Sequence, residues 1–246
     1  AMADALQKEG SSDNAINIFN QLMEKQPDNP SLYVLKARAL LEKGEYSKGF
    51  DVLGDVPASM RNPLEKPLWN GEDLTGKTIL LYSRLGPDEL NALIRLAPQI
   101  KSKGAAQVLV ECAAPFAPLL RTVQGVDDCI VSRQPRPSFD YHQSLEMLPS
   151  LLNLSDNDLA AGAPYFSPNA TRTAYWKKYF EQINKPKIGI LWRKENALKP
   201  DIYQSPTLAA LSPLLEINTI QIISLQTQCG IEEMASFPNK TKMLHI

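Results

Sequence analysis

The chain has 246 residues, enough for one large domain or two smaller ones, and a hydrophobic content of 43%, which is ordinary for a globular protein. Its formal net charge of −1 excludes the strong positive potential with which proteins attract nucleic acids or anionic membranes. No apolar run approaches the ~18 residues of a membrane helix, so we expect neither a nucleic-acid partner nor a membrane span.

The N-terminal sequence AMADALQKEG has no basic region followed by an apolar region, so it does not resemble a signal peptide. The three cysteines, Cys112, Cys129 and Cys229, lack CxxC or metal-ligand spacing. Two of them fall in predicted strands, where a buried free thiol is usual. These features favour a cytoplasmic location and predict no metal site and no covalently bound cofactor.

The first 57 residues contain a repeat with a period of 34 residues, which is the period of tetratricopeptide repeats. The paired positions are Gly10 and Gly44, Ala15 and Gly49, Phe19 and Leu53, and Leu22 and Val56. Small residues at 15, 37 and 49 are expected to let paired helices approach closely. We predict one complete repeat at about 30–57 and one that begins inside its first helix. Tetratricopeptide repeats usually bind peptides on a concave face, so we predict a peptide or protein partner. Because at least three repeats are normally needed for independent stability, we expect two repeats to pack on the next domain.

Residues 58–76 are rich in proline and glycine and predict a linker. Strands and helices then alternate over 77–168. Strands are predicted at 78–83, 107–112, 128–132 and 139–143, and helices at 88–103, 115–122 and 145–152. This alternation predicts a parallel sheet with right-handed crossovers in a doubly wound, Rossmann-like α/β domain.

The remaining residues, 169–246, predict a connecting helix and an incomplete second Rossmann-like domain. The helix, 171–183, has an aromatic stripe that we expect to pack in a core or between domains. Further strands are predicted at 187–192 and 219–226, with a third beginning at 242–246, and helices at 207–215 and about 231–236.

The turn after the first strand has two explanations. In open α/β sheets, ligands bind outside the carboxyl ends of the strands, so Gly86 and the acidic Asp88 and Glu89 are candidates for a binding turn. The same residues also form an ordinary helix start, because Pro87 suits the first helical position and acidic side chains face the positive end of the helix dipole.

A set of short motifs resembles one family in order and spacing. They are P-x-W-x-G-E-x-L-x-G-K-T-I-L-L at 67–81, A-P-L-L-R at 117–121, G-V-D at 125–127, F-D at 139–140, S-L-x-x-L-P at 144–149, P-Y-F at 164–166, I-G-I-L-W at 188–192 and I-S-L-Q at 223–226. With the repeats, the chain resembles bacterial tetratricopeptide-repeat proteins that carry a glycosyltransferase-like domain of the GT-B type, related to heptosyltransferases and O-linked N-acetylglucosamine transferase. The resemblance implies metal-independent, inverting transfer from a nucleotide-sugar donor in a complete parent protein.

The resemblance also implies roles for individual residues. The family usually has E-Q-G-x-G-D after the first strand, where this chain has Arg84 to Glu89, so one glycine remains as Gly86 and Asp88 replaces the second. Glu89 is the positional match for the general base and Asp88 its neighbour. Arg193 is the candidate cation for the donor phosphates. The family has an Arg-Ser pair before the next helix, and this chain has Gln204 and Ser205 there, so Ser205 is a further candidate for the donor site.

Two further residues are candidates with alternatives. His142 could face the cleft or be a structural histidine, and Gln226 could line the cleft or hold a loop. Two hypotheses remain: a glycosyltransferase-like protein whose isolated chain is inactive, and a non-catalytic tetratricopeptide and GT-B-like binding or assembly module. A Rossmann-type redox enzyme is disfavoured, because no GxGxxG follows any strand.

Overall fold

The computed structural model of the chain describes residues 12–56, 64–160, 164–193, 206–227, 230–237 and 242–246. The chain divides into two compact units, Ala1–Pro168 and Asn169–Ile246. Among the described residues, no helix combines the length and apolarity needed to cross a bilayer.

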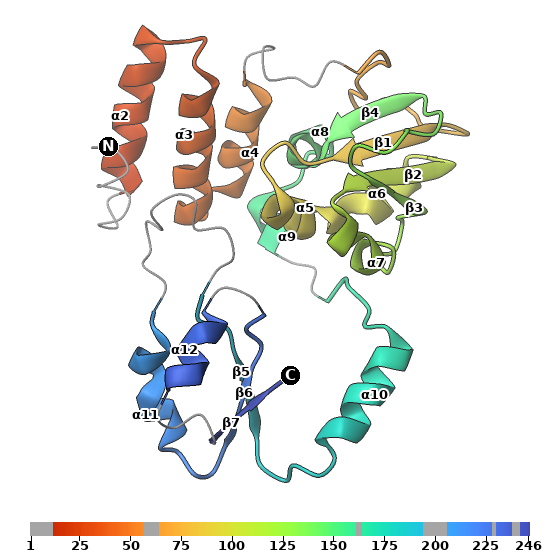
Figure 1. Cartoon of the computed structure of the whole chain (residues 1–246). Helices are drawn as coiled ribbons and strands as arrows, with labels where there is room; N and C mark the ends of the chain where they lie inside the picture. Colours follow the sequence, from red (N-terminus) through yellow and green to blue (C-terminus); the bar gives the residue numbers. More distant parts are fainter. Residues whose placement is uncertain (1–11, 57–63, 161–163, 194–205, 228–229, 238–241) are drawn as a thin grey trace. The chain divides into compact units, whose positions relative to one another are not determined.

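The first unit begins with three helices in successive hairpins: α2 (Ser12–Lys25), α3 (Pro30–Lys43) and α4 (Tyr46–Gly54). The Asn29 side chain caps α3 by accepting a hydrogen bond from the Ser31 N–H at 3.2 Å. The predicted close approach of helices is confirmed at Gly49, where an added Cβ would lie 2.8 Å from the Leu41 side chain. The helices therefore pair as the 34-residue period predicts (Figure 1).

A four-stranded sheet follows, and all of its neighbouring strands are parallel, as predicted. Its strands are β1 (Thr78–Tyr82), β2 (Gln107–Cys112), β3 (Asp128–Val131) and β4 (Tyr141–Ser144), in the order β3-β2-β1-β4. The fourth strand begins two residues later than predicted. Leu68 of the predicted linker forms a parallel bridge to His142, so the chain before β1 extends the sheet beside β4.

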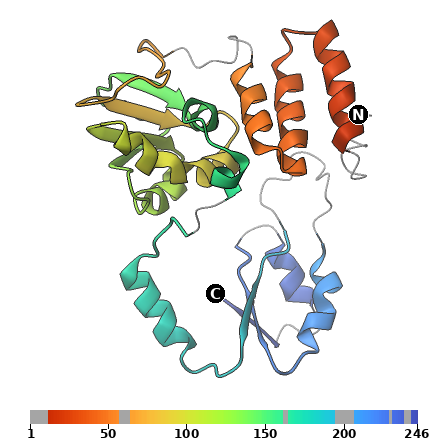
Figure 2. The same ribbon diagram turned by 180° about the vertical axis from the view of Figure 1, so that it is seen from behind.

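Helices cover one face of this sheet (Figures 1 and 2). They are α5 (Pro87–Leu93), η2 (Ile94–Leu96), α6 (Ala97–Ser102), η3 (Ala114–Phe116) and α7 (Ala117–Leu120). The prediction of one continuous helix over 88–103 is wrong, because a 3₁₀ turn interrupts it at η2. Pro98 has no N–H to donate to a carbonyl one turn earlier, so the regular ladder cannot run through this point.

The tetratricopeptide-like helices and the sheet share one hydrophobic core, which includes Phe50 and Leu53 of α4 together with Leu145 and Leu148. The chain after β4 forms η4 (Leu145–Met147), α8 (Leu148–Leu151) and α9 (Asp156–Ala160). Helix α4 packs on all three elements. Hydrogen bonds tie it there, from the Ser47 N–H to Asp156 at 2.7 Å and from the Ser150 hydroxyl to Asp51 at 2.6 Å.

The second unit contains a three-stranded parallel sheet in the order β5-β6-β7. Its elements are α10 (Ala170–Phe180), β5 (Lys187–Ile190), η5 (Leu208–Leu211), α11 (Ser212–Leu215), β6 (Gln221–Ser224), α12 (Ile231–Ser236) and β7 (Met243–His245). The predicted packing of the aromatic stripe in a core is wrong within this unit, because α10 buries no residue. Its rings stack on one another instead, with the Trp176 and Phe180 centroids 5.7 Å apart.

Candidate functional site

The strand order of the first sheet creates a switch point beside β1. The chain runs outward from β1 to β2 and β3, and then returns to place β4 on the other side of β1. In open α/β sheets, ligands bind in the crevice outside the carboxyl ends of the two strands that flank such a point. Here the crevice is bordered by the turn at 83–86 after β1, by η4 after β4, and by α4.

Glu146 holds the turn in place. Its side chain is buried, and Oε1 accepts hydrogen bonds from the Ser83 hydroxyl at 2.5 Å, the Arg84 N–H at 3.0 Å and the Leu85 N–H at 3.3 Å. The other oxygen, Oε2, is buried without a partner among the described residues, and so is the Ser144 hydroxyl. Since buried polar atoms nearly always have a partner, this end of β4 is incompletely satisfied.

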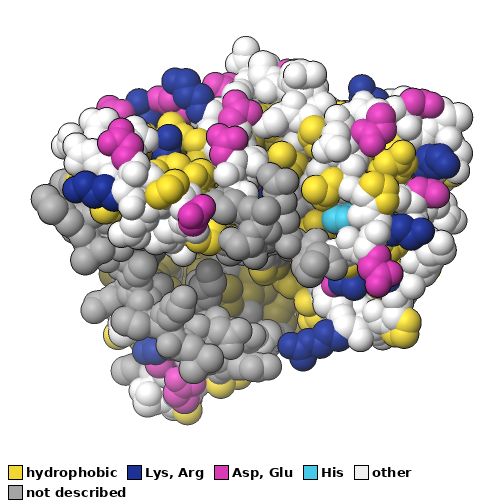
Figure 3. Space-filling view, turned by 90° about the horizontal axis from the view of Figure 1, so that it is seen from above, with side chains coloured by type: hydrophobic (Ala, Val, Ile, Leu, Met, Phe, Trp, Pro, Cys, Tyr) yellow, Lys and Arg dark blue, Asp and Glu magenta, His cyan; other side chains and the backbone are white. Residues whose placement is uncertain are grey.

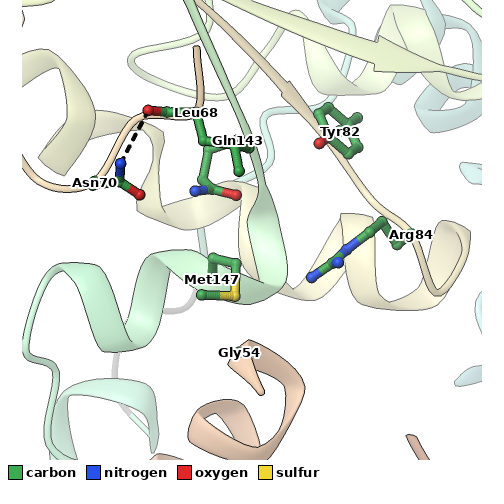
Figure 4. A pocket seen from close by; sticks show the side chains of 7 residues that line it. All are labelled: Gly54, Leu68, Asn70, Tyr82, Arg84, Gln143 and Met147. Carbon is green, nitrogen blue, oxygen red and sulfur yellow. Dashed lines mark hydrogen bonds between the residues drawn. The ribbon is translucent and has the colours of Figure 1, made fainter. Parts of the chain in front are cut away.

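Two adjoining cavities share the Arg84 side chain. The larger, of about 120 Å³, is lined by Gly54, Leu68, Asn70, Tyr82, Arg84, Gln143 and Met147 (Figure 4). The smaller, of about 30 Å³, is lined by Val34, Leu53, Val56, Arg84, Leu85 and Glu146. Repeat helices and sheet therefore build both cavities together.

Arg84 is the cation of this crevice. Its side chain extends from the segment after β1 toward Met147, and the Gln143 amide lies across from it (Figure 4). No ion pair or side-chain hydrogen bond joins the Arg84 guanidinium to another part of the chain that the structure describes. The Gln143 amide is occupied, since it donates to the Trp69 carbonyl at 2.8 Å and accepts from the Ser144 N–H at 2.8 Å.

His142 lies in the middle of β4 opposite Leu80, and both of its ring nitrogens have partners. Nε2 lies 2.9 Å from the Lys66 carbonyl and therefore carries the proton, so Nδ1 accepts from the Tyr82 hydroxyl at 3.1 Å. Burial lowers the pKa of His142 and raises that of Tyr82, which keeps both groups neutral. The structure thus joins His142 to the segment before β1 and to Tyr82.

The turn residues named from the sequence lie just outside the cavities. Gly86 precedes α5, and Asp88 and Glu89 occupy the first turn of that helix. Asp88 is exposed and Glu89 is half-buried, and neither side chain lines the two cavities. Ser205 lies outside the described residues.

In the second unit, Gln226 and Arg193 fix the carboxyl end of β5. The Trp192 and Arg193 N–H groups donate to Gln226 Oε1 at 3.2 and 3.0 Å, and Gln226 Nε2 donates to the Arg193 carbonyl at 3.0 Å. The Arg193 guanidinium pairs with Glu233 at 2.5 Å, while the other Glu233 oxygen accepts from the Leu208 N–H at 2.7 Å. Both candidates therefore have structural partners within their own unit.

The structure brings together residues that the sequence pattern did not single out, namely Tyr82, Arg84, Gln143 and Glu146. One signal could have found Glu146. It is the only charged residue in the segment 144–149, SLEMLP, where every neighbour is apolar or small. A carboxyl group in such a segment is expected to have specific hydrogen-bond partners.

The described part of the chain offers neither a metal-binding cluster nor an activated thiol. No cluster of His, Cys, Asp and Glu with metal-binding geometry occurs there. Cys112 and Cys129 are free and buried as predicted, and burial raises the pKa of Cys129 to about 12, so neither thiol is an activated nucleophile. Acidic and basic side chains are interspersed over the described surface in Figure 3, with no extended area of one sign.

Comparison with known proteins supports the repeat. The tetratricopeptide repeat family matches residues 6–65, which confirms the interpretation of the 34-residue period. No curated protein and no solved structure matches the chain.

Proposed function

We propose that the chain is a protein-binding module, in which the tetratricopeptide helices and the first sheet together recognise a peptide segment of a partner protein. The match to the repeat family supports this proposal, because such repeats commonly mediate protein interactions. The observation that carries it is the pair of cavities to which both α4 and the segment after β1 contribute, with α3 adding Val34 to the smaller one. A helical array fixed on a rigid sheet is preorganised, which reduces the entropy lost on binding.

The lining of the smaller cavity suits a peptide side chain at its rim. Four of its six residues are apolar, with Val34, Leu53 and Val56 from the repeat and Leu85 from the turn. Two polar side chains, Arg84 and Glu146, complete it. Binding sites of this kind combine apolar contact area with a few polar groups that fix orientation.

A peptide-display selection against the full chain tests the proposal, followed by fluorescence anisotropy on the enriched peptides. Leu85→Ser removes a half-buried leucine that lines the cavity, and Leu35→Ser removes a half-buried leucine of α3 that packs in another cluster. We expect at least fivefold weaker binding with Leu85→Ser and little change with Leu35→Ser. Absence of enriched peptides, or equal effects of the two variants, would overturn the proposal.

The second candidate is a glycosyltransferase-like function with a nucleotide-sugar donor. It is favoured by the two parallel sheets and by the acidic first turn of α5 after β1. In that case Glu89 would act as general base toward an acceptor hydroxyl. The cavity of about 120 Å³ beside the turn is small for a nucleotide-sugar, which is why we rank this function second.

Calorimetry with UDP-, GDP- and ADP-sugars separates the two candidates. The enzyme proposal requires measurable binding of one donor by the chain. In a complete parent protein it also requires turnover that is lost in Glu89→Ala and kept in Glu24→Ala, a control at an exposed position of α2. Absence of donor binding would remove this candidate and leave the protein-binding proposal intact.

A further inference from the structure

We propose that the larger cavity is a binding site for a carboxylate group, which the guanidinium of Arg84 holds. The cavity lies where the carboxyl ends of β1 and β4 meet α4, within one unit of the structure. Arg84 lies outside the repeat match at 6–65 and is not one of the candidate residues of the turn at 86–89.

The first argument is charge. Arg84 is half-buried, and its guanidinium has no anionic partner among the described residues. A partly desolvated cation is stabilised by an opposite charge, and the planar fork of arginine matches a carboxylate with two parallel hydrogen bonds. An anion that enters the cavity would supply this partner.

The second argument is the hydrogen-bonding state of the lining. The Tyr82 hydroxyl donates a hydrogen bond to His142 Nδ1, so its oxygen keeps lone pairs that can accept a further hydrogen bond. The Asn70 amide is exposed, and its one side-chain contact, to the Leu68 carbonyl, is long at 3.4 Å. The cavity therefore offers donors for a carboxylate beside an acceptor for an adjacent N–H or O–H.

The third argument is independent of Arg84. The buried Oε2 atom of Glu146 and the buried Ser144 hydroxyl lack partners among the described residues. Glu146 lines the smaller cavity, which adjoins the larger one at Arg84. An unsatisfied buried polar group destabilises the fold unless water or a ligand reaches it. Glu146 Oε2 can only accept a hydrogen bond, so it calls for a donor, from water or from the part of a ligand beside the carboxylate, and not for the carboxylate itself.

The same geometry favours a singly charged carboxylate over a phosphate. The cavity supplies one guanidinium, while the Glu146 carboxylate lines the smaller cavity, to which Arg84 also contributes. A doubly charged phosphate would meet repulsion from Glu146 without a second cation to offset it. Several positive groups or a run of free backbone N–H groups would be expected in a phosphate site.

Two sources can present this group: a small free acid, and the carboxylate of a peptide. The peptide source rests on the protein-binding function proposed above, whereas the carboxylate site itself does not. An N–H beside the carboxylate, as in an acylated amino acid, would meet the free lone pairs of Tyr82. We therefore expect N-acetylglycine to bind more tightly than acetate.

Titration of the full chain, followed by NMR or calorimetry, tests the site with matched acids and amides. The probes are acetate against acetamide, N-acetylglycine against N-acetylglycinamide, and inorganic phosphate. Arg84→Met removes the charge at similar length, and Arg84→Lys keeps the charge without the fork. Gly54→Leu fills the cavity from α4, where an added Cβ would meet only the flexible end of Met147 at 3.1 Å. Lys48→Gln, at an exposed position of the same helix, controls for the loss of one positive charge.

We expect the acids to bind and the amides not to bind. Affinity should fall at least tenfold in Arg84→Met and Gly54→Leu, fall less in Arg84→Lys, and remain unchanged in Lys48→Gln. Thermal unfolding of each variant shows whether the fold is kept, and Gly54→Leu leaves Arg84 intact should Arg84→Met fail to fold. Binding by acetate alone identifies a small-molecule source and leaves the site in place. No acid binding, equal binding of acid and amide, tighter binding of phosphate, or no effect of Arg84→Met would overturn the proposal.

Discussion

Glu146 is the residue through which the structure of the turn after β1 can be tested most directly. Replacement by leucine keeps the approximate volume and removes the acceptor of three hydrogen bonds, from the Ser83 hydroxyl and the N–H groups of Arg84 and Leu85. The Leu85 N–H retains the Ser83 oxygen at 3.2 Å. The Arg84 N–H has no second acceptor among the described residues.

The magnitude follows from these contacts. An orphaned N–H costs about 1–3 kcal/mol, and a hydrogen bond from a hydroxyl to a charged group contributes about 1.5–3 kcal/mol. Removal of the unpartnered Oε2 atom offsets part of this loss. We expect Glu146→Leu to lower the free energy of unfolding by about 2–3 kcal/mol. Glu146→Gln keeps an acceptor oxygen and should cost about 1 kcal/mol.

Urea unfolding followed by ¹⁹F NMR of 5-fluorotryptophan resolves the first unit from the second. Trp69 is fully buried in the core that the repeat helices share with the first sheet, whereas Trp176 and Trp192 belong to the second unit. The midpoint of the Trp69 resonance should shift in Glu146→Leu, and that of Trp192 should not. Equal stability of the leucine and glutamine variants would refute the role assigned to Glu146 Oε1.

Three further changes have outcomes that the structure specifies. Gly104→Ala should lower the free energy of unfolding of the first unit by about 3 kcal/mol in urea, because φ is +93° and the new Cβ would lie 2.6 Å from the Thr75 hydroxyl oxygen. The control is Gly44→Ala, where φ is +86° and nothing lies within 4 Å of the new Cβ. It should lower the free energy of unfolding by only about 1 kcal/mol. Burial lowers the pKa of His142 in the folded state, so the unfolded state binds more protons below about pH 6.5 and stability should fall as pH decreases through that range. The slope, at most about 1.4 kcal/mol per pH unit from this group, should be reduced in His142→Gln, and an unchanged slope would contradict the assignment. In a Cys229→Ser background, Ellman's reagent at pH 8 should find no reactive thiol until urea is added, because burial raises the pKa values of Cys112 and Cys129.

The sequence predicted the features that depend on local periodicity. The 34-residue spacing identified the small residues at 15, 37 and 49, and all three are buried between helices. Alternating apolar strands and helices predicted both parallel sheets, since β1 and β2 are apolar runs bounded by turn residues. The predicted bounds of β2, 107–112, agree with those in the structure, because Gly104 follows the helix before the strand and Pro115 lies at the start of the helix after it.

The features that the sequence did not predict depend on contacts between distant segments. Strand β4, with the sequence YHQS, is polar, and its register is fixed by Leu80, Leu68 and the Lys66 carbonyl and not by its own pattern. Arg84 occupies a position that is unremarkable in sequence, and its place in the two cavities depends on the packing of α4 against the first sheet. The roles of Glu89, Asp88 and Arg193 came from a resemblance, and they remain predictions.

The docking of α4 links the fold to the choice between the two functions. A nucleotide-binding crevice requires open space at the carboxyl ends of the strands beside the switch point. In this chain, Gly54 and Leu53 of α4 line that space, and Phe50 anchors the helix in the sheet's core. Because the helix is part of the core, it cannot leave without exposing buried apolar surface. The repeat therefore limits the crevice to ligands of a few heavy atoms or to one end of a peptide. The carboxylate site proposed above relies on Arg84, whereas the glycosyltransferase-like alternative relies on Glu89 of the acidic turn.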